Sequence, residues 1–111
     1  MIRCLFFLSA ILIGGSAFSQ TPAFKRGALL YEKHCATCHQ RDGAGVPRLI
    51  PPLAEASYVT GNKSQLIRIL LEGLNEPIVV QDEEYFSPMA SFSHLSDVEI
   101  SDILTFIRKK F

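Results

Sequence analysis

The stretch Cys35-Ala36-Thr37-Cys38-His39 decides how this sequence is interpreted, because it places two thiols and an imidazole close together. Before it, apolar residues recur at i, i+4, i+7 and i+11 from Phe24 to Cys35, a spacing that predicts an amphipathic helix. After it, residues 40–53 hold two glycines and three prolines, which is typical of a loop. A chemically reactive cluster is therefore expected where a helix ends and a long loop begins.

The C-x-x-C-H spacing is the signature of covalent c-type haem attachment. Two thiols separated by two residues can reach two vinyl groups on one porphyrin edge, and the adjacent His39 can then place Nε2 on the iron. A disulfide or thioredoxin-like redox pair is an alternative, but the sequence has no βαβ pattern to support that fold. Zinc is a third possibility, although a structural zinc site normally takes its ligands from two separated pairs, and there is one pair here.

A second iron ligand is predicted at Met89, the one methionine after residue 19. Its thioether sulfur suits haem iron, and a His/Met pair raises the reduction potential. A lone methionine otherwise fills a core, but Met89 lies in an aperiodic loop directly after Pro88. His34 and His94 are the other candidates for this position, and both are expected at the surface.

Length and charge limit the other possibilities. The chain has 111 residues, with eleven Lys and Arg against eleven Asp and Glu, which excludes a strongly basic nucleic-acid binder. Residues 1–19 are predicted to be a secretory signal peptide, with Arg3 before an apolar stretch and small residues before a cut at Gln20. An uncleaved membrane anchor is the alternative. We expect residues 20–111 to be one exported, periplasmic, monomeric domain that needs a cofactor to stabilise its small core.

The coarse pattern predicts an all-α fold of three to five helices with long loops. Helices are expected over 22–34 after the cap Thr21, over 63–72 after the cap Asn62, and after a capping box formed by Ser96 and Glu99. A shorter helix is expected over 54–58. Val79 and Val80 are the only strand-like pair, and they are expected to be too short to matter for the fold.

Several segments outside the motif carry a resemblance to a known family. They are G-x-x-x-Y from Gly27 to Tyr31, P-P-L from Pro51 to Leu53, M-A-S-F followed by L-S-D from Met89 to Asp97, and the apolar series Ile103, Phe106 and Ile107. Together with C-A-T-C-H, they make residues 20–111 resemble the class I, mono-haem cytochrome c family over nearly their full length. Ala90 departs from the family pattern, because many bacterial relatives have proline there, which makes this loop less stiff.

The resemblance implies a fold and a site. The terminal helices would cross near Gly27, around one haem c bound through Cys35 and Cys38, with the iron between His39 and Met89. A proline carbonyl of P-P-L would accept a hydrogen bond from Nδ1 of the histidine; Pro52 is the preferred acceptor and Pro51 the alternative.

The resemblance also implies that the protein is not an enzyme but carries single electrons by outer-sphere transfer. It would do so in a respiratory chain, as a free carrier or as a subunit of an oxidoreductase, between partners such as a dehydrogenase donor and an oxidase acceptor. The acidic run Asp82–Glu84 precedes the Met89 loop, which suggests that it lies near the docking face. The alternatives are a haem enzyme or gas-binding protein with a labile sixth ligand, and a zinc- or disulfide-stapled interaction domain without haem.

Overall fold

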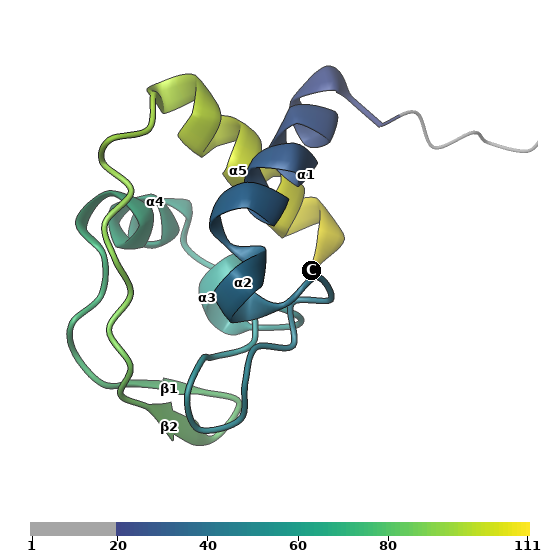
Figure 1. Ribbon diagram of the computed structural model, residues 1–111. Coiled ribbons are helices and arrows are strands. Elements are labelled where there is room, and N and C mark those ends of the chain that lie inside the picture. Colours follow the sequence, from purple (N-terminus) through teal and green to yellow (C-terminus); the bar gives the residue numbers. More distant parts are fainter. Residues whose placement is uncertain (1–19) are drawn as a thin grey trace, which may run out of the picture.

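The computed structural model describes residues 20–111 (Figure 1). The predicted signal peptide, with Arg3 and Cys4, lies outside the described residues. The elements are the helices α1 (Pro22–His34), α2 (Ala36–His39), α3 (Ser57–Thr60), α4 (Lys63–Glu72) and α5 (Asp97–Lys110), and the strands β1 (Ile78–Val80) and β2 (Glu83–Tyr85). The predicted, mostly helical fold is confirmed. Across residues 20–111, no helix is both long enough and apolar enough to span a bilayer.

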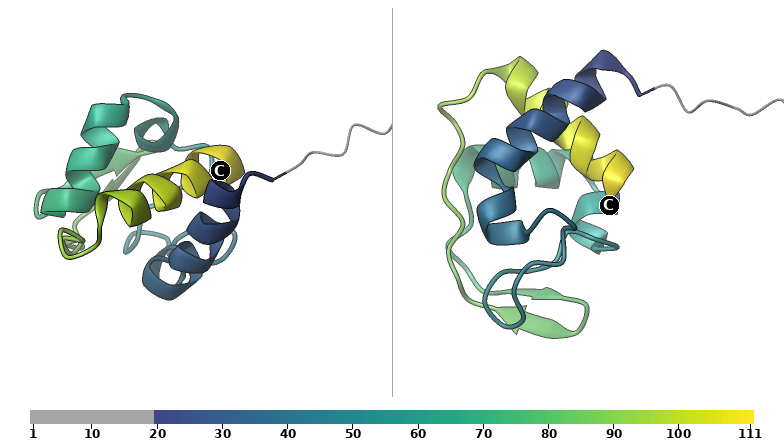
Figure 2. Two further views of the ribbon diagram at one scale, coloured as in Figure 1. Left: turned by 90° about the horizontal axis from the view of Figure 1, so that it is seen from above. Right: turned by 45° about the vertical axis from the view of Figure 1, so that its right-hand side comes forward.

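Helices α1 and α5 cross, and Gly27 makes the crossing possible (Figure 2). A Cβ atom at position 27 would collide with the carbonyl oxygen of Asp102 and lie 2.9 Å from Cβ of Phe106. Around this contact, the rings of Phe24 and Tyr31 pack on Phe106 with centroid distances of 5.1 and 5.2 Å. The crossing near Gly27 is therefore confirmed, and it forms the part of the core that depends on side-chain packing.

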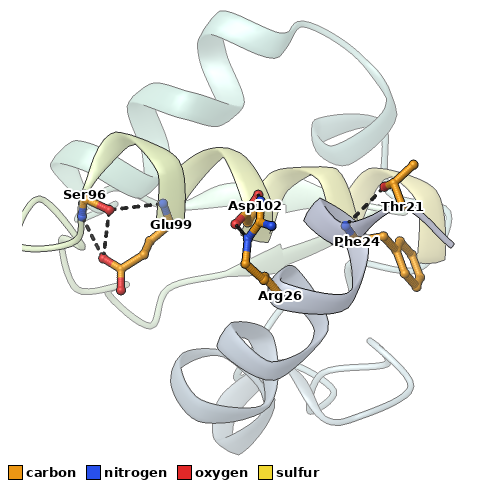
Figure 3. A network of polar contacts seen from close by, with 6 residues as sticks. All are labelled: Thr21, Phe24, Arg26, Ser96, Glu99 and Asp102. Atoms are coloured by element: carbon orange, nitrogen blue, oxygen red, sulfur yellow. Dashed lines mark hydrogen bonds and ion pairs between the residues drawn. The ribbon is translucent and has the colours of Figure 1, made fainter.

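Polar contacts fix the ends and the register of the two helices (Figure 3). Arg26 of α1 donates two hydrogen bonds, of 2.6 and 3.0 Å, to the buried carboxylate of Asp102 in α5. At the start of α5, the capping box predicted from Ser96 and Glu99 is present, and the amide of Ser96 donates to Glu99 at 2.9 Å. Each of these hydrogen bonds has at least one charged partner, and such hydrogen bonds are stronger than those between neutral groups.

Two shorter elements differ from the sequence prediction. The helix expected over 54–58 is wrong in its bounds: α3 covers Ser57–Thr60, because the preceding residues form a turn in which Glu55 has a φ of 58°. Arg108 of α5 fixes α3 by donating to the carbonyls of Val59 and Gly61, at 2.7 and 3.1 Å. In contrast, α4 begins after Asn62 and ends at Glu72, directly before Gly73, as predicted.

The expectation that Val79 and Val80 are too short to matter is wrong, because they belong to a strand that helps to line the cavity described below. They belong to β1, which pairs antiparallel with β2 in the register Ile78↔Tyr85 and Val80↔Glu83. The turn between the strands consists of Gln81 and Asp82, which have φ angles of 52° and 63° in place of the glycine or asparagine that usually signals such a turn. The hairpin lies at the end of the molecule away from the crossing of α1 and α5 (Figure 1).

Candidate functional site

His39 ends the short helix α2, which continues α1 through the Cys35–His39 motif. The amide of His39 donates to the carbonyl of Cys35 at 2.9 Å, so the motif forms one helical turn. The imidazole is buried, and this desolvation lowers the pKa of His39 because it disfavours the charged ring. The ring is therefore neutral at pH 7. With its Nδ1 3.0 Å from the carbonyl oxygen of Pro51, it is placed to donate from Nδ1 and to keep a lone pair on Nε2.

The acceptor for His39 is Pro51, and the preference for Pro52 is wrong. The reason is the path of the loop: Val46 and Ile50 exchange two backbone hydrogen bonds, of 2.9 and 2.8 Å, which turn the chain back toward α2. The Pro51 carbonyl then lies against Gly45, where a Cβ atom would be 2.7 Å from its oxygen. Pro52, like Pro51, lines the cavity described below.

The two cysteines differ in their surroundings. Cys35 is partly buried and Cys38 is exposed. Burial, with a smaller contribution from Cys38, raises the pKa of the Cys35 thiol to about 11, so this thiol is uncharged at pH 7. Both side chains line the same cavity as His39.

Met89 lies in the segment that connects β2 to α5, and backbone hydrogen bonds attach this segment to the end of α4. Met89 and Leu74 exchange two of them, at 2.8 and 2.9 Å, and the amide of Phe92 donates to Leu70 at 2.8 Å. Gly73 allows this approach, because a Cβ atom there would lie 2.5 Å from the carbonyl oxygen of Met89. The loop is thus held in place although Ala90 stands at the position where proline was expected.

One apolar cavity of about 290 Å³ brings the predicted site residues together, a volume many times that of a water molecule. Its lining includes Cys35, Cys38, His39, Pro52 and Met89. The walls are mainly aliphatic and aromatic and come from α3, α4, the hairpin and α5; among them are Tyr58, Leu66, Leu70, Val80, Tyr85 and Ile103. The roles of the five predicted residues stay a prediction, but they share one site.

The other two histidines differ in position. His34 lines the cavity, whereas His94 is exposed and is absent from its lining. The two rings lie 6.4 Å apart, and Phe92 packs near both of them. Within residues 20–111, no three His, Cys, Asp or Glu side chains are grouped so that they could hold a metal ion.

A protein-family model described as cytochrome c matches residues 24–110, which is most of the chain. The chain belongs to the cytochrome c family. Members of this family transfer electrons with covalently bound haem c, and the donor set of this cavity fits that group. It offers a neutral imidazole with a free Nε2, a thioether and two thiols within apolar walls.

Among known proteins, this cytochrome c is similar to cytochrome c-552 of Thermus thermophilus. The two are 38% identical over 104 residues, which cover 90% of the chain and 67% of the relative. It is also 34% identical over 84 residues to the cytochrome c subunit of the quinone alcohol dehydrogenase of Gluconobacter oxydans. The cytochrome c subunit of gluconate 2-dehydrogenase from Pantoea cypripedii is 34% identical over 85 residues. About three quarters of this chain matches less than a fifth of each dehydrogenase subunit.

Several cavity residues of this cytochrome c come from short elements and loops that carry no periodic signal in the sequence. Ile50, Tyr58 and Tyr85 are separated by loops and share no period. A signal was available in α4, because Leu66 and Leu70 lie four residues apart and both face the cavity. A second, weaker signal was the alternation of Ile78 and Val80, which line the cavity, with the exposed Val79 between them.

Proposed function

We propose that this protein is an exported electron carrier that binds one haem c through Cys35 and Cys38, with His39 and Met89 as axial ligands. One observation carries the proposal: both predicted axial ligands and both cysteines line the same apolar cavity. Haem c, when bound, supplies reversible one-electron oxidation and reduction.

His39 is prepared for ligation by its surroundings. Burial keeps the ring neutral, and the hydrogen bond to the Pro51 carbonyl fixes both the tautomer and the orientation of the ring. Such a partner on the second ring nitrogen also increases the basicity of the ligating nitrogen. Gly45 contributes indirectly, because it leaves room for the Pro51 carbonyl beside α2.

Met89 decides between a carrier and an enzyme. With the Met89 thioether as a second ligand, a bound haem iron would have no open site for substrate, and only electrons would be exchanged. The paired hydrogen bonds with Leu74 support this role, because they restrain the backbone of Met89 on both its amide and its carbonyl. The apolar walls would shield a bound haem from water, which would favour the less charged reduced state.

The cellular setting is proposed from the leader and from the relatives. Residues 1–19 would direct export to the periplasm, with cleavage before Gln20. Because several relatives are cytochrome subunits of dehydrogenases, we take a dehydrogenase as the electron donor. An oxidase is the proposed acceptor. N-terminal sequencing of the exported product tests the cleavage: a chain that still begins at Met1 would mean a membrane anchor.

Optical spectra of the matured protein test the ligation. We expect a low-spin spectrum, a ferric Met–iron charge-transfer band that is lost in Met89→Ala, and no binding of carbon monoxide by the reduced protein. His94→Ala is the matched control and should leave all three unchanged, because His94 is exposed outside the cavity. A high-spin spectrum or rapid binding of carbon monoxide would instead support a haem enzyme or gas-binding protein.

A further inference from the structure

The β1–β2 hairpin separates the cavity from solvent, and its two faces differ. Ile78, Val80 and Tyr85 on the inner face line the cavity. On the outer face, Val79 is 59% exposed and Phe86, the residue after β2, is 64% exposed. Val79 pairs with Glu84, and Phe86 lies two residues beyond Glu84, so the two apolar side chains are diagonal neighbours on one face. Two exposed apolar side chains thus lie on the face of the hairpin opposite to the face that lines the cavity.

This outer face lies within a stretch of one charge sign. From residue 69 to residue 107 the chain has eight Asp and Glu and no Lys or Arg. At the hairpin, Glu83 makes an ion pair of 3.6 Å with Arg48. Asp82 and Glu84 are exposed, and neither forms an ion pair with any residue between 20 and 111. The exposed apolar pair therefore has two free carboxylates beside it.

The hairpin also has a fixed position. The side-chain amide of Gln81, in the turn, donates to the carbonyl of Ala54 at 2.9 Å. The Arg48–Glu83 pair attaches the neighbouring strand to the loop 46–50. A surface that is already ordered loses little conformational entropy when a partner binds.

We propose that the outer face of the hairpin, formed by Val79, Glu84 and Phe86, docks a redox partner protein with an apolar patch rimmed by Lys or Arg. The proposal rests on the electron-transfer function above. Apolar side chains at the centre of a contact supply most of the binding free energy, and charges at its rim set the association rate and the choice of partner. The free carboxylates disfavour binding of this face to an anionic membrane surface, because such a surface would repel them.

A redox-inert complex with the partner's chemistry, [Cr(1,10-phenanthroline)₃]³⁺, tests the surface without electron transfer. It is apolar, cationic and paramagnetic, and it is added to the reduced, matured protein while amide NMR signals are recorded. We expect signals of residues 76–86 to broaden first, and those of α1 to remain sharp. Broadening centred on the exposed Cys38, or spread evenly over the molecule, would overturn the proposal.

Variants with matched controls separate the charge from the apolar contact. Using [Co(1,10-phenanthroline)₃]³⁺ as one-electron oxidant, Glu84→Lys should reduce the second-order rate about tenfold at low salt, which corresponds to about 1.4 kcal/mol. Val79→Ser and Phe86→Ser should each reduce it about threefold, and this loss should persist at high salt. The controls are Glu72→Lys for the charge, Val98→Ser (62% exposed) for Val79, and Leu29→Ser (75% exposed) for Phe86.

The outcomes distinguish a failed surface from a failed function. If the hairpin variants and their controls show equal rates while the spectra remain low-spin, the docking surface is wrong and the carrier function stands. If the spectra of the unmodified protein are high-spin, the carrier function itself is wrong, and the chromium titration still reports the surface. Binding of the protein to vesicles of phosphatidylcholine and phosphatidylglycerol, lost in Phe86→Ser, would assign the face to a membrane and overturn the proposal.

Discussion

The crossed helices α1 and α5 and the segment 73–96 are held by different interactions. The helices contact each other through side chains, with Phe106 packed between the rings of α1. The segment 73–96 instead depends on backbone hydrogen bonds, such as the pair between Leu74 and Met89, and on the two-stranded hairpin. The two helices thus have a core of their own, whereas the segment 73–96 forms one side of the cavity. The stability of this segment therefore depends on what fills the cavity.

Removal of the cofactor should have the largest effect. A chain produced without cytochrome maturation lacks the group that the walls of the cavity would contact, so the free energy of binding is also free energy of folding. We expect this chain to be largely unfolded, with no cooperative thermal transition in far-UV circular dichroism. A cooperative, native-like transition would show that the helix crossing alone stabilises the fold, and that the two regions are less different than proposed.

Gly27→Ala tests the helix crossing in the matured protein. The new methyl group would collide with the backbone carbonyl of Asp102, which cannot rotate away as a side chain can. We expect a loss of about 3 kcal/mol in the free energy of unfolding, measured with guanidinium chloride. Leu29→Ala, at an exposed position in the same helix, is the control and should change it by less than about 0.5 kcal/mol. Equal stability of the two variants would mean that α1 can move away from α5 at little cost.

The same contrast explains what could be predicted from the sequence. The bounds of α1 and α4 were correct, because caps such as Thr21 and Asn62 and a 3.6-residue period are local signals. The crossing at Gly27 was predicted from the resemblance. The hairpin was missed because Glu83 and Glu84 are poor strand formers, and the order of β2 comes from pairing with β1 rather than from its own residues.

For the site, the sequence predicts residues that do line one cavity, but not how each of them is held in place. Cys35, Cys38, His39 and Met89 were all predicted, since their residue types and spacing are visible in one dimension. Which of the two prolines, Pro51 or Pro52, accepts a hydrogen bond from His39 could not be predicted, because it depends on how the loop 46–50 closes on itself. A one-residue difference along the chain turns a carbonyl in another direction, and only the folded loop determines which one meets His39.

Gly73→Ala tests the segment 73–96 in the same way as Gly27→Ala tests the helices. Gly73 has φ 77° and ψ −169°, a conformation that costs other residues about 1–3 kcal/mol. The added methyl group would also displace the carbonyl of Met89. We expect a loss of about 2 kcal/mol, together with a weaker Met–iron charge-transfer band, whereas Gly27→Ala should leave that band unchanged while the protein is folded.

Asn75→Ala provides the control for Gly73→Ala, because Asn75 is exposed and lies two residues further along the chain. Its charge-transfer band and its free energy of unfolding should match those of the unmodified protein. A full-strength band in Gly73→Ala would show that the sulfur of Met89 does not depend on the backbone contact with α4.

The smallest effect is expected at the boundary between the two regions, where the Ser96–Glu99 capping box begins α5. The hydrogen bond from the Ser96 amide lowers the pKa of the Glu99 carboxyl below its usual value, because it favours the ionised form. The contribution of Glu99 to stability is therefore complete above that usual value and is lost as the pH falls through the lowered pKa. Glu99→Gln should be slightly less stable than the unmodified protein at pH 7, and the difference should disappear in acid.

Glu72→Gln is the matched control for this experiment, because Glu72 is an exposed carboxylate in the last turn of α4 and takes no part in the capping box. Its free energy of unfolding should parallel that of the unmodified protein between pH 3 and pH 7. If Glu99→Gln differed by the same amount at both ends of this range, the charge of Glu99 would not be the cause. The hydrogen bonds of the capping box would then stabilise the start of α5 without a contribution from the charge of Glu99.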